Sequence, residues 1–157
     1  MIPILQPVYQ RWDETQISLL DCLSQFPADR YRWHPGPKAS CAGDILLHIA
    51  RGETGYARMA LGQPREPLEA AVADHASALA VLQAAADRAR DAFERLTEAD
   101  LEQVVAEVWH PLSTRVEGPM TPLWFLEQMI RHKAYHLGQL WYISLLLEED
   151  PPAGRYS

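Results

Sequence analysis

Two histidines, His132 and His136, stand four positions apart near the C-terminal end of this 157-residue chain. Four residues of an α-helix turn through about 400°, so the two imidazoles project from one face, roughly 40° apart and ~6 Å along the axis. Neutral imidazoles at that spacing can bind one metal ion. Lys133 occupies the position where a zinc-protease motif requires glutamate, which excludes that class and leaves a third ligand to be found elsewhere.

The other four histidines of the chain are the candidates for that third ligand. His34 lies in a turn-rich segment and is expected to pack in a loop, and His75 lies among small residues as a packing or surface residue. His110 precedes a proline in a predicted loop, where ligands are common. His48 lies inside a predicted helix, and its surroundings are the more informative.

The helical face of His48 carries two glycines, Gly52 and Gly55, and one carboxylate, Asp44. Glycine costs about 1 kcal/mol relative to alanine inside a helix, so two of them on one inward face call for a reason. They either leave a hollow beside the imidazole or allow close packing of helices. Asp44 either orients the imidazole ring or favours the helix N-terminus by its charge.

The pattern of apolar residues and turn formers predicts four helices, which makes the chain all-α. Ser40 is expected to cap the second helix and Thr121 the fourth, with Pro122 in its first turn. The segment 97–120 begins with a cap and short turn and continues with strand-like composition broken by prolines, which fits a short hairpin or a long loop. The predicted helices cover residues 4–26, 40–61, 68–96 and 121–150.

The last predicted helix carries a polar cluster of Gln128, His132, His136 and Gln139 in an otherwise apolar stripe. Its opposite side is apolar too, so we expect this helix to be buried on all sides. Buried polar groups need partners, and a metal ion would satisfy the histidines.

Composition sets broad limits on the function. Hydrophobic residues make up 48% and charged residues 22% of the sequence, as expected for one globular domain spanning residues 1–157. The net charge of −7 argues against a nucleic-acid partner. No signal peptide or long apolar run is visible, and the two cysteines suggest no disulfide framework, so we expect a cytoplasmic protein without membrane contact.

The stretches WHPGPKAS, DILLHIARGE and HKAYHLGQL, taken together, resemble the DinB/YfiT-like family of metal-dependent proteins. The likeness spans almost the whole chain in length and helix order. It implies a four-helix bundle with up-down-down-up topology and a homodimer. It also implies that His48, His132 and His136 are the metal ligands.

Three histidines with open coordination positions are typical of a catalytic site, because a structural zinc is normally closed by four protein ligands. Imidazoles suit zinc, nickel, iron or copper, and we expect a divalent ion, zinc or nickel. Such an ion lowers the pKa of bound water towards ~7 and would do the same for a small thiol. The family includes thiol-dependent transferases, so the resemblance implies hydrolysis or thiol transfer on a small-molecule substrate, with a low-molecular-weight thiol as a candidate co-substrate.

We expect six residues to surround the metal ligands or line the substrate pocket. Glu53 and Glu127 face away from the histidines on their helices, so no general base is assigned. Two rival functions stay open: a non-catalytic metal- or ligand-binding homodimer, and a scaffold whose dimer face contains Leu137 and Trp141. The six expected residues are Asp44, Gly52, Tyr56, Gln128, Tyr135 and Gln139.

Overall fold

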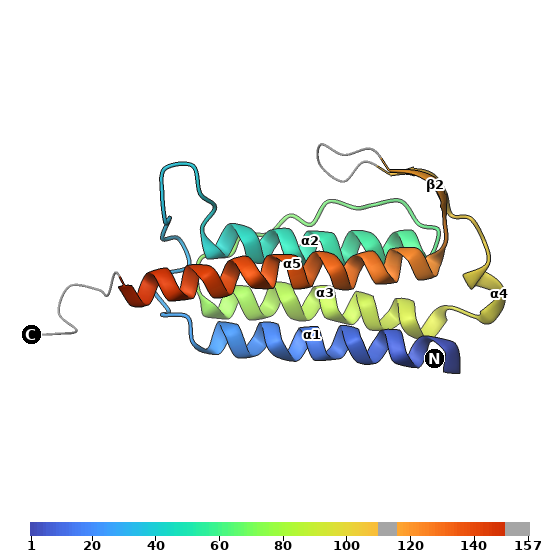
Figure 1. The fold of residues 1–157 in the computed structure, drawn as a ribbon, viewed down its shortest axis with the longest axis horizontal. Coiled ribbons are helices and arrows are strands. Elements are labelled where there is room, and N and C mark those ends of the chain that lie inside the picture. The colour runs from blue at the N-terminus through green and yellow to red at the C-terminus, as the bar shows by residue number, and fades with distance from the viewer. Residues whose placement is uncertain (110–115, 150–157) are drawn as a thin grey trace, which may run out of the picture.

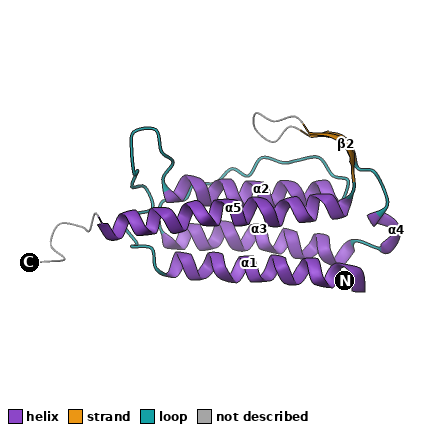
Figure 2. Ribbon diagram, in the orientation of Figure 1, coloured by secondary structure: helices purple, strands orange, loops and turns teal. Residues whose placement is uncertain are grey.

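The structure is a computed structural model that describes residues 1–109 and 116–149, and it consists mainly of long helices. A short 3-10 turn at Pro3–Leu5 leads into the first helix, and a hairpin of two strands precedes the last (Figure 2). The elements are α1 (Gln6–Ser24), α2 (Ala42–Ala60), α3 (His75–Arg95), α4 (Glu98–Leu101), β1 (Ala106–Trp109), β2 (Val116–Met120) and α5 (Pro122–Glu149).

The four long helices lie side by side, with α1 and α5 running in one direction and α2 and α3 in the other (Figure 1). This is the up-down-down-up order that the family resemblance implied. α2 packs against both α3 and α5, and α5 also packs against α1. The α2–α5 contact matters most here, because the three expected metal ligands are divided between these two helices.

The third helix was predicted to begin at residue 68, and this was wrong: it begins at His75. Asp74 and Ser77 form a reciprocal cap, in which the Asp74 carboxylate accepts a hydrogen bond from the Ser77 backbone N–H at 2.8 Å. Such a cap satisfies free N–H groups of the first turn, so the helix begins there. The preceding residues are extended instead, and they carry the chain back along α2 so that α3 can run parallel to it (Figure 1).

Of the caps predicted for α2 and α5, one is confirmed and the other is wrong. Thr121 caps α5 as expected, its hydroxyl accepting from the Trp124 backbone N–H at 3.3 Å. Ser40 does not cap α2, because the helix starts one residue later and Cys41 holds the N-cap position without a side-chain bond. Asp44 supplies the negative charge that the first turn of α2 favours.

The segment between α3 and α5 contains a hairpin, the first of the two predicted alternatives. Thr97 caps the short α4 through a reciprocal bond with Asp100, and β1 then pairs antiparallel with β2. Gly118 has φ +127°, a conformation that side-chain-bearing residues rarely adopt. His110 and the tail 151–157 lie outside the described residues.

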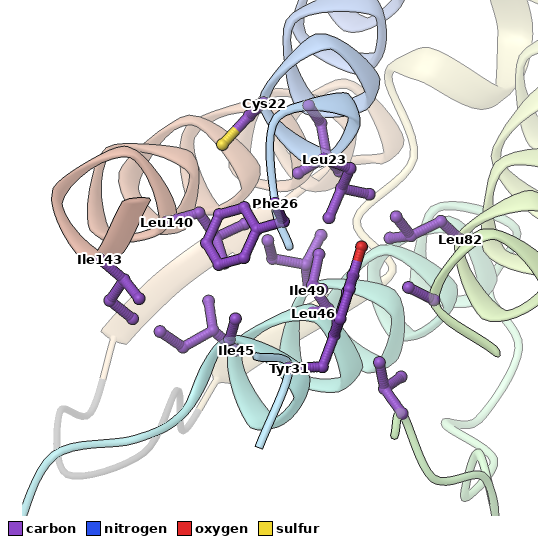
Figure 3. Close-up of a cluster of buried hydrophobic side chains, with 14 of the residues drawn as sticks. Cys22, Leu23, Phe26, Tyr31, Ile45, Leu46, Ile49, Leu82, Leu140 and Ile143 are labelled. Carbon is purple, nitrogen blue, oxygen red and sulfur yellow. The ribbon is translucent and has the colours of Figure 1, made fainter. Parts of the chain in front are cut away.

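Buried side chains of all four long helices meet along the bundle axis (Figure 3). α5 is not buried on all sides, contrary to expectation: Tyr135, Tyr142 and Leu145 have 67%, 63% and 55% of their surface exposed. Among the described residues, the long helices against which α5 mainly packs are α1 and α2, and these three side chains lie away from that contact. Within the described ranges, no helix has the length and apolarity needed to cross a membrane.

Candidate metal centre

Three imidazoles meet at the middle of the seam between α2 and α5. His48 comes from α2, and His132 and His136 come from consecutive turns of α5. The ring centroids are 4.8 Å apart for His48 and His132, 4.6 Å for His48 and His136, and 4.5 Å for His132 and His136. The predicted convergence of these rings from two helices is therefore present in the structure.

The ring nitrogens are arranged as a metal site requires. One nitrogen from each ring lies within 4.8 Å of the other two, and Nε2 of His132 lies 2.9 Å from Nε2 of His48. Two nitrogens bound to one zinc at ~2.0–2.1 Å in tetrahedral geometry would be about 3.3 Å apart, so these two need to move by only a few tenths of an ångström. The donor set fits a divalent transition-metal ion.

Gly52 makes this approach possible. A β-carbon built at Gly52 would lie 2.4 Å from Cε1 of His132, so the imidazole occupies the space that a side chain would take. At Gly55 a β-carbon would lie 2.7 Å from Nε of Arg65. Neither glycine leaves a hollow: both allow close approach, one to a ring of α5 and the other to an arginine of the α2–α3 connection.

His48 and His132 are held in the neutral form. Burial, together with the neighbouring His136, lowers the pKa of His48 below its ordinary value. The same two causes, helped by His48, lower the pKa of His132 to about 3. A neutral imidazole is the form that binds metal, so these two side chains are ready for coordination at neutral pH.

Gln139 and Tyr135 contact the third ligand. The side-chain oxygen of Gln139 lies 2.7 Å from Nδ1 of His136 and can accept a hydrogen bond from Nδ1–H, which leaves Nε2 as the ligand atom. The Tyr135 ring meets His136 edge-on, with centroids 5.0 Å apart. Both residues are among the six expected around the site.

The other expected residues lie further from the ring nitrogens. The buried Tyr56 packs edge-on against His132 at 5.6 Å between centroids, and Gln128 lies half-buried one turn before His132. Asp44 is directed to Arg32 instead of His48, with 2.7 Å between the charged atoms. A hydrogen bond from the Cys41 thiol, together with Arg32, holds the pKa of Asp44 below its usual range.

An apolar groove opens beside His136, with a volume of about 660 Å³. It lies between the N-terminal end of α2, the 35–40 loop and the exposed face of α5. Tyr135 and Gln139, which contact His136, form part of its wall, whereas none of the three histidines lines it. The other lining residues are Pro35, Ala39, Ser40, Ile45, Gly138, Tyr142, Ile143 and Leu146.

A buried ion pair next to the metal centre, on the core side of α5, was not predicted. Lys133 donates to Glu53 at 2.5 Å and to Gln16 at 2.7 Å, and its ammonium lies 4.9 Å from the Trp12 ring centroid. Only 1% of the Lys133 and Glu53 side chains is exposed. The sequence signal for this pair is a lysine and a glutamate at inward positions of two apolar helices, because buried charges need a partner.

A second group of metal-binding side chains occurs at the start of α2. Ligand atoms of His34, Cys41 and Asp44 also lie within 4.8 Å of one another. Here the carboxylate is already paired with Arg32, and burial raises the pKa of the Cys41 thiol. Both effects oppose metal binding, and the three-histidine group is the better candidate.

The fold and the site define a class: an all-α four-helix bundle with a three-histidine group on the seam of its second and last long helices. The family model described as the DinB superfamily matches residues 11–140. The chain belongs to this superfamily. No curated protein matches the sequence.

Two solved structures share the fold. The first, a conserved protein from Enterococcus faecalis, has a TM-score of 0.75 and 16% identity over 95% of this chain and 99% of its own. The second, a DinB-like protein from Bacillus subtilis, has a TM-score of 0.68 and 15% identity over 91% of this chain and 92% of its own. At these identities the likeness concerns the fold alone.

Proposed function

We propose that this protein is a metal-dependent enzyme in which His48, His132 and His136 hold one divalent ion, zinc or nickel. The observation that carries the proposal is the convergence of three imidazoles, with nitrogens as close as 2.9 Å and the pKa values of His48 and His132 lowered. Three protein ligands leave coordination positions open, which is the arrangement of a catalytic rather than a structural site.

The ion would lower the pKa of a water molecule or small thiol at an open position, which makes a nucleophile available near neutral pH. The protein's own side chains do the remaining work. Gln139 keeps the proton of His136 on Nδ1, and Gly52 lets the ring of His132 reach the centre. The groove beside His136 offers apolar walls for a small-molecule substrate. The reaction is therefore hydrolysis or transfer of a low-molecular-weight thiol.

We assign no general base. Glu53 is directed to Lys133 in the core, and Glu127 lies 3.7 Å from Arg11 on the surface, so both carboxylates have partners away from the histidines. We further propose a cytoplasmic location, which the two free, buried thiols of Cys22 and Cys41 support.

Metal analysis of the purified, untagged protein tests the proposal. We expect close to one zinc or nickel ion per chain, removal by a chelator with a fall in melting temperature, and recovery when the ion is returned. His136→Ala should bind the ion much more weakly. A chelated protein with an unchanged melting curve and no affinity for zinc or nickel would contradict the proposal. A screen of thiol transfer and ester hydrolysis then separates the two reactions.

A non-catalytic, metal-binding homodimer is the second candidate. The exposed aromatic and aliphatic residues of α5, Tyr142 and Leu145, support a contact between two copies. Leu137 and Trp141 pack against the core instead, so they contribute less to such a face than expected. Sedimentation of the wild type and of Leu145→Glu tests the dimer. If metal removal changes stability but no turnover is found, this candidate is favoured over the enzyme.

A further inference from the structure

Two arginines lie on the α2 side of the metal centre. Arg51 follows His48 by three residues on α2, so the two side chains are neighbours on one helical face. Its Nε donates to the backbone oxygen of Leu68 at 3.1 Å, and the side chain is exposed. Arg65 comes from the connection between α2 and α3 and lies across the same helix.

Gly55 and Gly52 show where Arg65 lies relative to His132. Its guanidinium lies against Gly55, where a β-carbon would come within 2.7 Å of Nε and 3.1 Å of Nη2. The ring of His132 lies against Gly52 in the same way. The β-carbon positions of residues three apart on a helix are ~5–6 Å from each other, so the guanidinium of Arg65 and the imidazole of His132 lie against adjacent turns of α2.

Both arginines bring positive charge to the α2 side of the histidines. The guanidinium of Arg65 lies against Gly55, one turn from Gly52 and the His132 ring, and Arg51 lies one turn after His48. Positive charge here works against a metal cation, and it stands out in a chain of net charge −7.

We propose that a ligand of the metal centre, the small thiol or the substrate, carries an anionic group that is held by Arg65 with help from Arg51. This inference rests on the proposed function and narrows it to anionic ligands. A guanidinium next to the centre attracts such a ligand and orients it while its reactive atom reaches the open metal position. When the anion is bound, its negative charge offsets the repulsion between the two arginines and the metal ion.

Three thiols of the same length test the proposal with nickel-loaded protein: 2-mercaptoethanesulfonate, 2-mercaptoethanol and cysteamine, which carry a negative, a neutral and a positive end. The thiolate-to-metal absorption band gives the affinity of each, and sulfonate itself binds metals weakly. The wild type is compared with Arg65→Met and Arg65→Lys. Arg58→Met is the matched control, since it loses contacts to the same connection away from the site.

We expect Arg65→Met to lower the ratio of the sulfonate affinity to the cysteamine affinity roughly five- to tenfold. Arg65→Lys should retain most of that ratio, and Arg58→Met all of it. The preference should shrink in high salt, because the Debye length falls to ~3 Å at 1 M. Melting curves and metal content are recorded for every variant.

The outcomes separate this inference from the proposed function. Full metal occupancy with no thiol band, or with a ratio that Arg65→Met leaves unchanged, would overturn the inference and leave the metal site standing. Protein that binds no nickel at all would overturn both together.

Discussion

A β-carbon on Gly52 would lie 2.4 Å from Cε1 of His132, closer than real β-carbons come to other atoms. The ring is the far end of a rotatable side chain, so Gly52→Ala should fold but turn His132 away from His48. We expect metal affinity to fall at least tenfold, measured by competition with a coloured chelator.

Gly138 provides the control for that substitution. It lies on α5, is exposed, and has no atom within 4 Å of an added β-carbon. Gly138→Ala should therefore leave metal affinity unchanged and raise the free energy of unfolding by about 0.5–1 kcal/mol through helix propensity. Equal metal affinity in the two variants would show that Gly52 is not needed for the site.

Gln139→Ala should weaken metal binding by about 10- to 100-fold, because Nδ1 of His136 loses its acceptor. Gln139→Glu keeps an acceptor and should bind at least as tightly as the wild type. Gln139 is exposed, so the melting temperature of the metal-free protein should stay the same in both. Isothermal titration with zinc measures the difference, and a wild-type affinity in Gln139→Ala would refute this role.

Lys133→Met should destabilise the protein by about 3–5 kcal/mol, because it leaves the buried Glu53 carboxylate without its cation. The double variant Lys133→Met with Glu53→Gln should cost clearly less than the sum of the single changes, since a neutral amide still accepts from Trp12. Urea unfolding gives the three values. The exposed pair of Arg11 and Glu127 is the reference, and Glu127→Gln should change stability by under ~1 kcal/mol.

Metal-free protein should lose stability as pH falls below about 6.5. The folded pKa of His132 is lowered to about 3, so the unfolded chain binds a proton there that the folded chain excludes. This contribution is fully present above the unfolded pKa of ~6.5 and decreases as pH falls towards 3, amounting to at most ~2 kcal/mol between pH 7.5 and 5.

His132→Gln removes this titration and should show a smaller loss over the same range, measured by urea unfolding at both pH values. An identical pH dependence in the two proteins would assign the effect to other groups, such as His48, whose pKa is also lowered.

Local signals predicted much of the fold. Helix periodicity located the four long helices, and Thr121 with Pro122 marked the start of α5. The start of α3 was missed because residues 68–74 have helix-forming composition, whereas the Asp74–Ser77 cap and the need to return along α2 keep them extended. A cap and a crossover depend on where neighbouring elements lie, which local propensity does not encode.

The sequence by itself determined that His132 and His136 share a helical face, because four residues always make slightly more than one turn. Only the tertiary structure decided that His48 joins them, that Gly52 accommodates a ring of another helix, and that Lys133 and Glu53 pair in the core. Each of these contacts crosses between helices. It depends on how α2 and α5 pack, and periodicity within one helix carries no information about the partner it will meet.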